Sequence, residues 1–184
     1  MRYQVSCPVA IGASSWSISD ELGQSPFRVD CRSWNGGDAI GILDGRSVMV
    51  AEARLHRGIY HRHCELFRNG QHVAHIRTSL LRGIRSCFVG ELYGPDTLEV
   101  HGAFEDQQYR FVRCNRTVAL VSSMWGQTPD SFGVELCQSE DAILILIAAL
   151  AIRGLCGPVP QPQQVFTLPQ RMDAQTAGSK LVAG

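Results

Sequence analysis

Apolar and polar residues alternate through most of the chain. Apolar side chains occupy every second position in stretches such as 27–31 (FRVDC) and 132–136 (FGVEL). A period of two is typical of half-buried strands, because neighbouring side chains point to opposite faces of a sheet. The same pattern recurs in SWSIS, HVAHI, CFVGEL, TLEVHG, YRFVRC and TVALVS. No βαβ alternation is present, so the pattern predicts an antiparallel sheet of roughly ten or more strands.

Two dipeptides predict tight hairpins between these strands. Asp44-Gly45 lies in ILDGRSV and Asn69-Gly70 in ELFRNGQHV, each between apolar stretches. A two-residue type I′ turn needs positive φ at both central residues, which Asn, Asp and Gly tolerate best. We therefore expect a type I′ hairpin at each dipeptide.

The segment SEDAILILIAALAIRGL, residues 139–155, predicts a helix of a different kind. Residues 142–152 are eleven consecutive apolar residues with no polar stripe. Ser139 suits the N-cap, Arg153 suits the last turn, and Gly154 favours termination. A membrane-spanning helix needs roughly 20 apolar residues, so this one is too short to span. A helix that is apolar on all sides must be surrounded by protein.

A large antiparallel sheet and one wholly apolar helix favour a single architecture. Sheets of this size curl, split or close, and closure also removes exposed edges. We predict a closed antiparallel barrel around the helix, a mainly β domain spanning residues 1–157. Residues 158–184 are rich in Pro and Gln and contain little to bury, so we expect a disordered tail.

Composition agrees with one globular domain in a reducing compartment. The chain has 184 residues, of which 45% are hydrophobic and 18% charged, with zero net charge. Seven single cysteines lack a C-x-x-C pair, so we expect them to be reduced core residues of a cytoplasmic protein. We also expect the protein to be a monomer and to need no cofactor. Neutral net charge gives no reason to expect a nucleic-acid partner. The cysteines are Cys7, Cys31, Cys64, Cys87, Cys114, Cys137 and Cys156.

Four blocks resemble the LURP-one-related proteins, which belong with tubby C-terminal domains and phospholipid scramblases in a tubby-like superfamily. The blocks are WSISDELGQSPFRVDCR, LDGRSVMVAEARLHRGIYHRHCELFRNGQHVAHI, LEVHGAFEDQQYRFVRCNRTVALVSSMW and DSFGVELCQSEDAILILIAALAI. The resemblance implies a twelve-stranded antiparallel barrel threaded by a C-terminal helix. It also implies a weak internal duplication, for which FRNGQHVAHIRTSLL and VRCNRTVALVSSMW are candidates. It supplies no shared catalytic motif, so we expect a non-enzymatic protein.

Charge is distributed unevenly along the chain. Residues 54–85 hold seven Arg and five of the six His against one acid, Glu65, which gives +6 with His neutral and leaves −6 elsewhere. Guanidinium groups bind phosphate bidentately. We therefore expect this segment to bind an anionic or phosphorylated ligand, or a phospholipid headgroup in peripheral contact with a membrane. The candidate residues are Arg54, Arg57, Arg62, Arg68, Arg77, Arg82 and Arg85.

That expectation has competing interpretations. Strand alternation would scatter the arginines over both faces of a sheet. Tubby domains bind phosphoinositides through basic residues, but those positions cannot be matched here, so no site residue is carried over.

Two further functions remain open from the sequence. HRHCE places His61 and His63 on one strand face, which suits a metal-dependent, cupin-like enzyme, although Glu65 follows closer than that pattern requires. His72 and His75 are three residues apart and are predicted to point to opposite faces. A protein-interaction or structural module would instead use aromatic residues as contacts. Candidates are Trp34, Tyr60, Tyr93 and Trp125, and we expect Trp125 to pack.

Overall fold

A computed structural model describes most of the domain. The described residues are 1–6, 15–34, 37–57, 62–78, 86–91, 97–126, 131–137 and 140–156. The predicted tail, residues 158–184, lies outside them. Within the described part, twelve strands precede one α-helix, α1 (Ala142–Cys156). The strands are β1 (Arg2–Ser6), β2 (Ser15–Asp20), β3 (Phe27–Trp34), β4 (Gly37–Asp44), β5 (Met49–Arg57), β6 (Arg62–Arg68), β7 (Gln71–Thr78), β8 (Ser86–Glu91), β9 (Leu98–Ala103), β10 (Gln108–Arg113), β11 (Arg116–Ser122) and β12 (Phe132–Leu136).

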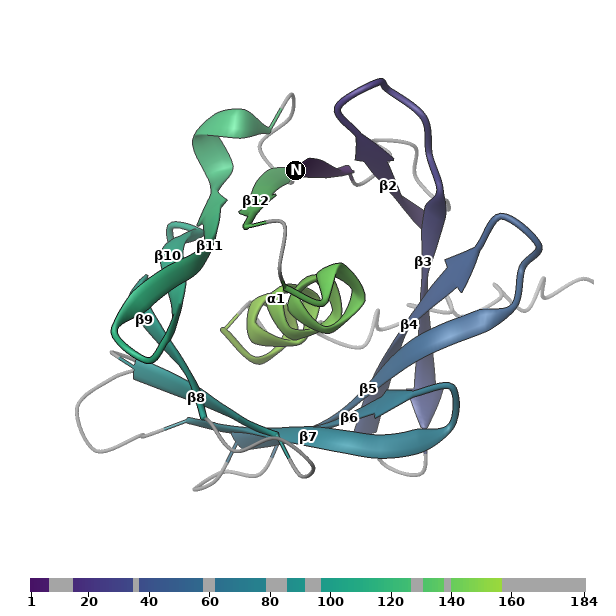
Figure 1. The fold of residues 1–184 in the computed structure, drawn as a ribbon. Coiled ribbons are helices and arrows are strands. Elements are labelled where there is room, and N and C mark those ends of the chain that lie inside the picture. The colour runs from purple at the N-terminus through teal and green to yellow at the C-terminus, as the bar shows by residue number, and fades with distance from the viewer. Residues whose placement is uncertain are drawn as a thin grey trace, which may run out of the picture.

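The strands form one closed antiparallel barrel, as predicted (Figure 1). Each strand pairs with its neighbours in sequence, and β1 pairs with both β2 and β12. Closure leaves no strand edge exposed to another chain.

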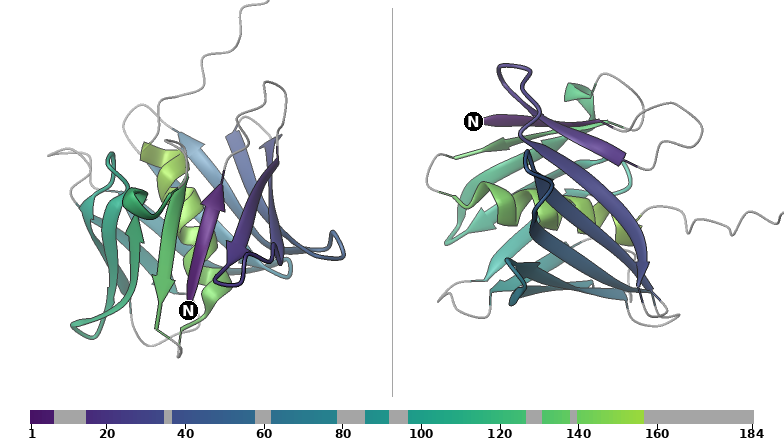
Figure 2. Two further views of the ribbon diagram at one scale, coloured as in Figure 1. Left: turned by 90° about the horizontal axis from the view of Figure 1, so that it is seen from above. Right: turned by 90° about the vertical axis from the view of Figure 1, so that its right-hand side faces the viewer.

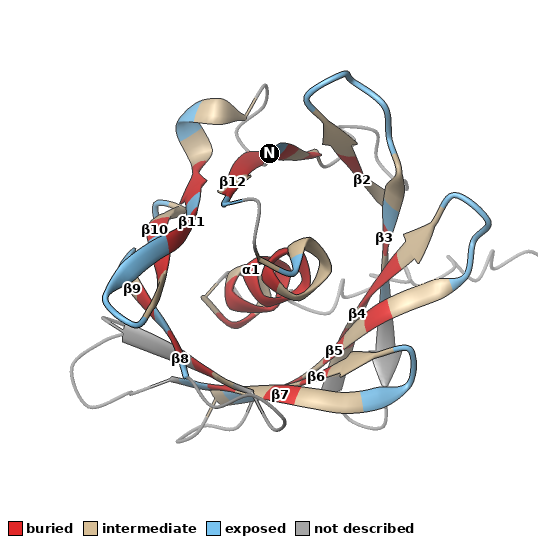
Figure 3. Cartoon of the chain, viewed as in Figure 1, coloured by how far each residue is buried: buried red, intermediate tan, exposed pale blue. Residues whose placement is uncertain are grey.

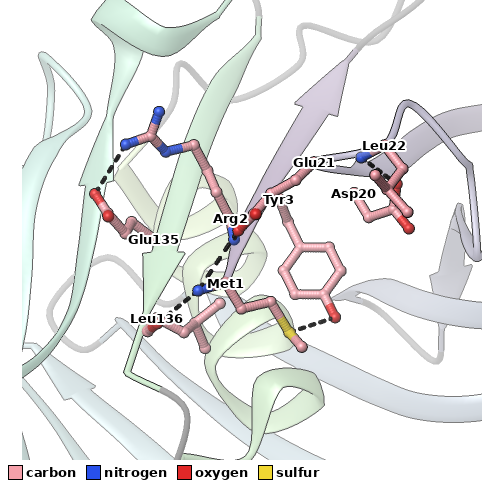
Figure 4. Close-up of polar contacts among 8 residues, drawn as sticks. All are labelled: Met1, Arg2, Tyr3, Asp20, Glu21, Leu22, Glu135 and Leu136. Atoms are coloured by element: carbon pink, nitrogen blue, oxygen red, sulfur yellow. Dashed lines mark hydrogen bonds and ion pairs between the residues drawn. The ribbon is translucent and has the colours of Figure 1, made fainter.

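Backbone pairing at the closing strand is reinforced by side chains of β1 (Figure 4). The Arg2 guanidinium lies 3.2 Å from the Glu135 carboxylate on β12, while the Arg2 amide donates to the Glu21 carboxylate beyond β2. The Tyr3 hydroxyl donates to the Met1 sulfur at 3.1 Å. The carboxylates of Glu135 and Glu21 thus link β1 to β12 on one side and to the end of β2 on the other.

The helix lies inside the barrel, with strands on all sides (Figures 1 and 2). Nine of its residues are buried, including the continuous stretch Ile145–Ile152, and the buried positions of the strands face them (Figure 3). α1 begins at Ala142, because the Asp141 carboxylate accepts the amides of Ile143 and Leu144 at 3.1 and 3.2 Å and so acts as the N-cap. None of the described helices is long and apolar enough to cross a membrane.

One predicted turn type is correct and the other is wrong. Asn69 and Gly70 have φ of 47° and 79° and join β6 to β7 as a two-residue turn. The hairpin at Asp44-Gly45 exists, but its turn is longer. The Asp44 carbonyl accepts the Ser47 amide, the Asp44 amide donates to the Val48 carbonyl, and Ser47 takes the positive φ of 62°. The Asp44 side chain also accepts the amides of residues 46 and 48, which stabilises the longer turn.

Three hairpins share a β-bulge at a Val-Ala pair. The pairing register skips Val50 between β4 and β5, Val73 between β6 and β7, and Val118 between β10 and β11. An alanine follows each skipped valine, and each bulge lies within a few residues of a turn. The three bulges are two and four strands apart, whereas equivalent strands of two halves of this barrel would be six apart, so the bulge is a recurring local feature and the duplication stays a prediction.

The prediction that the cysteines are core residues is mostly wrong. Of the five whose burial is described, Cys64 alone is fully buried, while Cys31, Cys114 and Cys137 are exposed. Cys114 lies in the β10–β11 turn with φ of 49°, where a side chain must point to solvent. None of these five forms a disulfide.

Candidate functional site

The basic segment forms β5, β6 and β7, whose residues alternate between the interior and the outside of the barrel. Ala53 and Leu55 on β5 and Cys64 and Leu66 on β6 are fully buried and face the helix. Each residue between them faces outward. This alternation separates the predicted arginines into two groups.

Arg62 and Arg68 belong to the inward group and contact the two ends of α1. Arg62 donates to the Leu155 carbonyl at 2.7 Å, and Arg68 forms an ion pair with the Asp141 carboxylate. The Arg62 guanidinium stabilises the C-terminus of α1, where the helix carbonyls carry partial negative charge. The Arg68 guanidinium holds the N-terminus in place through the carboxylate of Asp141, the N-cap residue. β6 thus carries one arginine for each end of the enclosed helix, and we do not include these two in the candidate surface.

The outward group makes a continuous surface, which we call the β5–β7 face. Backbone pairing aligns its residues in three rows across the strands: His56, His63 and Arg77; Arg54, Glu65 and His75; and Glu52, Phe67 and His72.

The prediction that His72 and His75 point to opposite faces is wrong. His72 pairs with Phe67 and His75 pairs with Glu65, both of which face outward on β6. The bulge at Val73 supplies the extra residue that returns His72 to the outer face. Four of the six histidines of the chain therefore lie on one surface.

The first row is the most exposed part of the β5–β7 face. The His56 and His63 rings stack with centroids 4.4 Å apart and planes 7° from parallel. The Glu65 carboxylate lies 3.6 Å from the His56 Nε2 atom. His63 and Arg77 are exposed and directly paired across β6 and β7. This row places Arg77 and the His63 imidazole where a ligand can reach them, while His56 is half-buried and its Nε2 atom is covered.

Arg54 is held against the surface by neighbours on two strands. Its Nε atom lies 3.1 Å from the Glu52 carboxylate, and its guanidinium carbon lies 4.1 Å from the centre of the Phe67 ring. The Phe67 ring also contacts the His72 ring, and the centroids of these two rings are 5.1 Å apart. The second and third rows are thus more ordered than the first row and less accessible to a ligand.

His75 lies flat over the neighbouring strand. A Cβ atom on Gly90 of β8 would lie 2.7 Å from the His75 ring, so the absence of a side chain at residue 90 leaves the space that the ring occupies. Burial lowers the pKa of His75 below the ordinary histidine value, and the nearby Arg77 and His72 lower it further. This imidazole becomes charged at a lower pH than an ordinary histidine.

The remaining predicted residues lie outside what the structure describes. The backbone of Arg57 belongs to β5, but its side chain is not described, and the same holds for Trp34 on β3. Arg82, Arg85, His61, Tyr60 and Tyr93 fall wholly outside the described residues. Within the described residues, no group of three His, Cys, Asp or Glu side chains could hold a metal.

A hollow on the opposite part of the barrel is the other candidate site. It has a volume of about 450 Å³, and its lining includes His101, Arg110, Leu120 and Trp125 on β9–β11 and the short helix after β11. His101 is paired with Glu99 at 2.8 Å. The hollow offers an apolar floor but fewer basic groups than the β5–β7 face, which is therefore the better candidate for an anion.

Trp125 packs against the barrel, as expected. A Cβ atom on Gly133 would lie 2.7 Å from the Trp125 Cβ atom, so the side chain rests directly on the backbone of β12. The Arg2 guanidinium covers the ring at 4.7 Å from its centroid. These contacts explain Trp125 without a partner protein.

Comparison with known proteins agrees with this architecture. The family model described as LURP-one-related matches residues 1–153. An Arabidopsis thaliana protein solved by X-ray crystallography is similar in fold, with a TM-score of 0.56 and 13% sequence identity over 82% of this chain and 89% of the other. No curated protein matches the sequence. The match over most of the chain shows that this protein belongs to the LURP-one-related family.

Proposed function

We propose that the protein is a non-enzymatic binding module whose β5–β7 face binds anionic phospholipid headgroups. The observation that carries the proposal is the row in which exposed His63 and Arg77 lie side by side and half-buried His56 stacks on His63. Phosphate oxygens accept hydrogen bonds from guanidinium and imidazolium groups, and such charge-assisted bonds are the strongest that side chains make.

The shape of the surface favours a membrane over a small ligand. The face is the outer side of three adjacent strands, about 10 Å from β5 to β7 at the usual strand spacing. An array of headgroups can contact every row at once, whereas a single phosphate can contact only one or two residues. The phosphoinositide binding of tubby domains, which this sequence resembles, is in line with this choice.

Co-sedimentation with lipid vesicles tests the proposal. Binding to phosphatidylglycerol-containing vesicles is compared with binding to neutral phosphatidylcholine vesicles at several pH values from 5.5 to 7.5. Arg77→Ala should weaken binding about fivefold, the effect of one basic residue near an anionic membrane. Arg110→Ala is the matched control, because Arg110 is an exposed arginine on β10, separated from β7 by two strands.

Two outcomes would contradict the proposal. Absence of binding to anionic vesicles at every pH would end it, as would an equal loss in Arg77→Ala and Arg110→Ala, which would mean that charge acts without regard to position. Addition of inorganic phosphate distinguishes the two sources of the anion. Competition at low millimolar concentrations, with the ionic strength held constant, would point to a free phosphorylated ligand in place of the membrane.

A further inference from the structure

We propose that protons control the β5–β7 face: it is electrically neutral when its histidines are neutral and becomes a cationic surface when they are protonated. This proposal rests on the proposed function and specifies how that function is regulated. It follows from the geometry, which places four imidazoles on one surface and removes two arginines from it.

The formal charges of the described face cancel. Arg54 and Arg77 are balanced by Glu52 and Glu65, so the histidines alone decide its sign. Of the seven arginines in the basic segment, Arg62 and Arg68 contact the helix and do not contribute to this face, and the side chains of three others, Arg57, Arg82 and Arg85, lie outside what the structure describes. Full protonation would add four positive charges.

The residues that pair directly with this face on the neighbouring strands are uncharged. On β4, Ala39 is paired with Arg54, and Gly41 with Glu52. On β8, Gly90 is paired with His75. The groups that face the histidines are thus those of the face itself, among the side chains that the structure describes.

The four histidines have different neighbours, so protonation of each one changes the charge of the face in a different way. Glu65 is beside His56, so protonation of this ring forms an ion pair and cancels an acidic charge that would repel phosphate. His63 is exposed and paired with Arg77, so its charge would extend an existing cationic site. His72 packs on Phe67, and His75 is partly buried over Gly90. His63 is consequently the position at which protonation changes the accessible surface most, and His56 acts beneath it by neutralising Glu65.

The expected effect is large within the range where histidine titrates. Histidine changes charge between about pH 5 and 8. Each positive charge near an anionic membrane strengthens binding about fivefold. Protonation of both His56 and His63 should therefore strengthen it by up to about 25-fold, because the two stacked rings disfavour two charges side by side. Because phosphatidylglycerol remains anionic over this range, the change arises in the protein.

Vesicle binding at pH 5.5 and pH 7.5 tests the proposal with a double variant, His56→Gln/His63→Gln. The parent protein should bind phosphatidylglycerol vesicles at least tenfold more tightly at pH 5.5, and most of that difference should disappear in the variant. His101→Gln, which changes a histidine of β9 outside the face, should retain it. Urea unfolding at both pH values verifies that each variant is folded.

The results distinguish this proposal from the one on which it rests. Equal binding at both pH values would overturn proton control and leave lipid binding intact. A pH effect that survives in His56→Gln/His63→Gln, or that disappears in His101→Gln, would overturn the assignment to this face. Absence of binding at both pH values would overturn both proposals.

Discussion

Leu146→Ala should destabilise the protein by about 3–5 kcal/mol, because the helix is enclosed and the cavity cannot collapse. Leu146 lies within the buried stretch of α1 and is 0% exposed. Leu→Ala substitutions in cores cost about 2.7–5 kcal/mol, with the larger values where surrounding atoms do not move in to fill the space. A closed sheet has little freedom to move inward, which puts this substitution in the upper part of the range.

Urea unfolding followed by circular dichroism measures this loss. The midpoint should fall with little change in the slope, and a loss of 4 kcal/mol should lower the melting temperature by about 8–16 °C for a domain of this size. Leu120→Ala is the matched control, since Leu120 is 40% exposed on β11 and should change stability by less than about 0.5 kcal/mol. A loss below about 1 kcal/mol in Leu146→Ala would refute enclosure of the helix.

Three other predictions concern the helix ends and the titrating groups. Asp141→Ala should cost about 1–2 kcal/mol in urea unfolding, and a following Arg68→Ala should cost less than it does alone, because both changes remove the same ion pair. Burial raises the pKa of the Cys156 thiol to about 11, so iodoacetamide at pH 8 should alkylate Cys156 far more slowly than exposed Cys114, as measured by mass spectrometry; equal rates would contradict its burial. Burial and adjacent basic groups lower the pKa of His75, so the folded state disfavours its protonation. The stability this gives is complete above the ordinary histidine pKa and is lost as the pH falls below it. His75→Gln should therefore lose less stability than the parent between pH 7.5 and 5.5, and an unchanged pH dependence would contradict the shift.

Periodicity was enough to predict the architecture. Strands such as β12 alternate strictly, and the apolar run of α1 leaves no face for water, so enclosure by a sheet is the physical solution that remains. The same alternation also contained a signal that the interpretation of the basic segment missed. Arg62 and Arg68 share the parity of buried Cys64 and Leu66, which places them on the inner face. At the two ends of a strand, an inward arginine reaches the polar termini of an enclosed helix.

The arrangement of the histidines could not be predicted from periodicity. It depends on the bulge at Val73, which changes the face of His72 and is set by the pairing of β6 with β7. The turn at Asp44 failed as a prediction for a different reason, since its side chain accepts two backbone amides and stabilises a longer loop. Strand pairing decides the first irregularity, and a local side chain decides the second.

Hydrogen exchange of the amides of Ile145–Ile152 tests the central claim most directly. The inward or outward direction of every side chain on β5–β7 is defined by the position of the helix, so the candidate surface depends on it as well. The account predicts that these amides exchange only through global unfolding, with the same free energy as urea unfolding gives. Exchange through local opening, several kcal/mol below that value, would mean that the helix leaves the barrel, and would contradict the account.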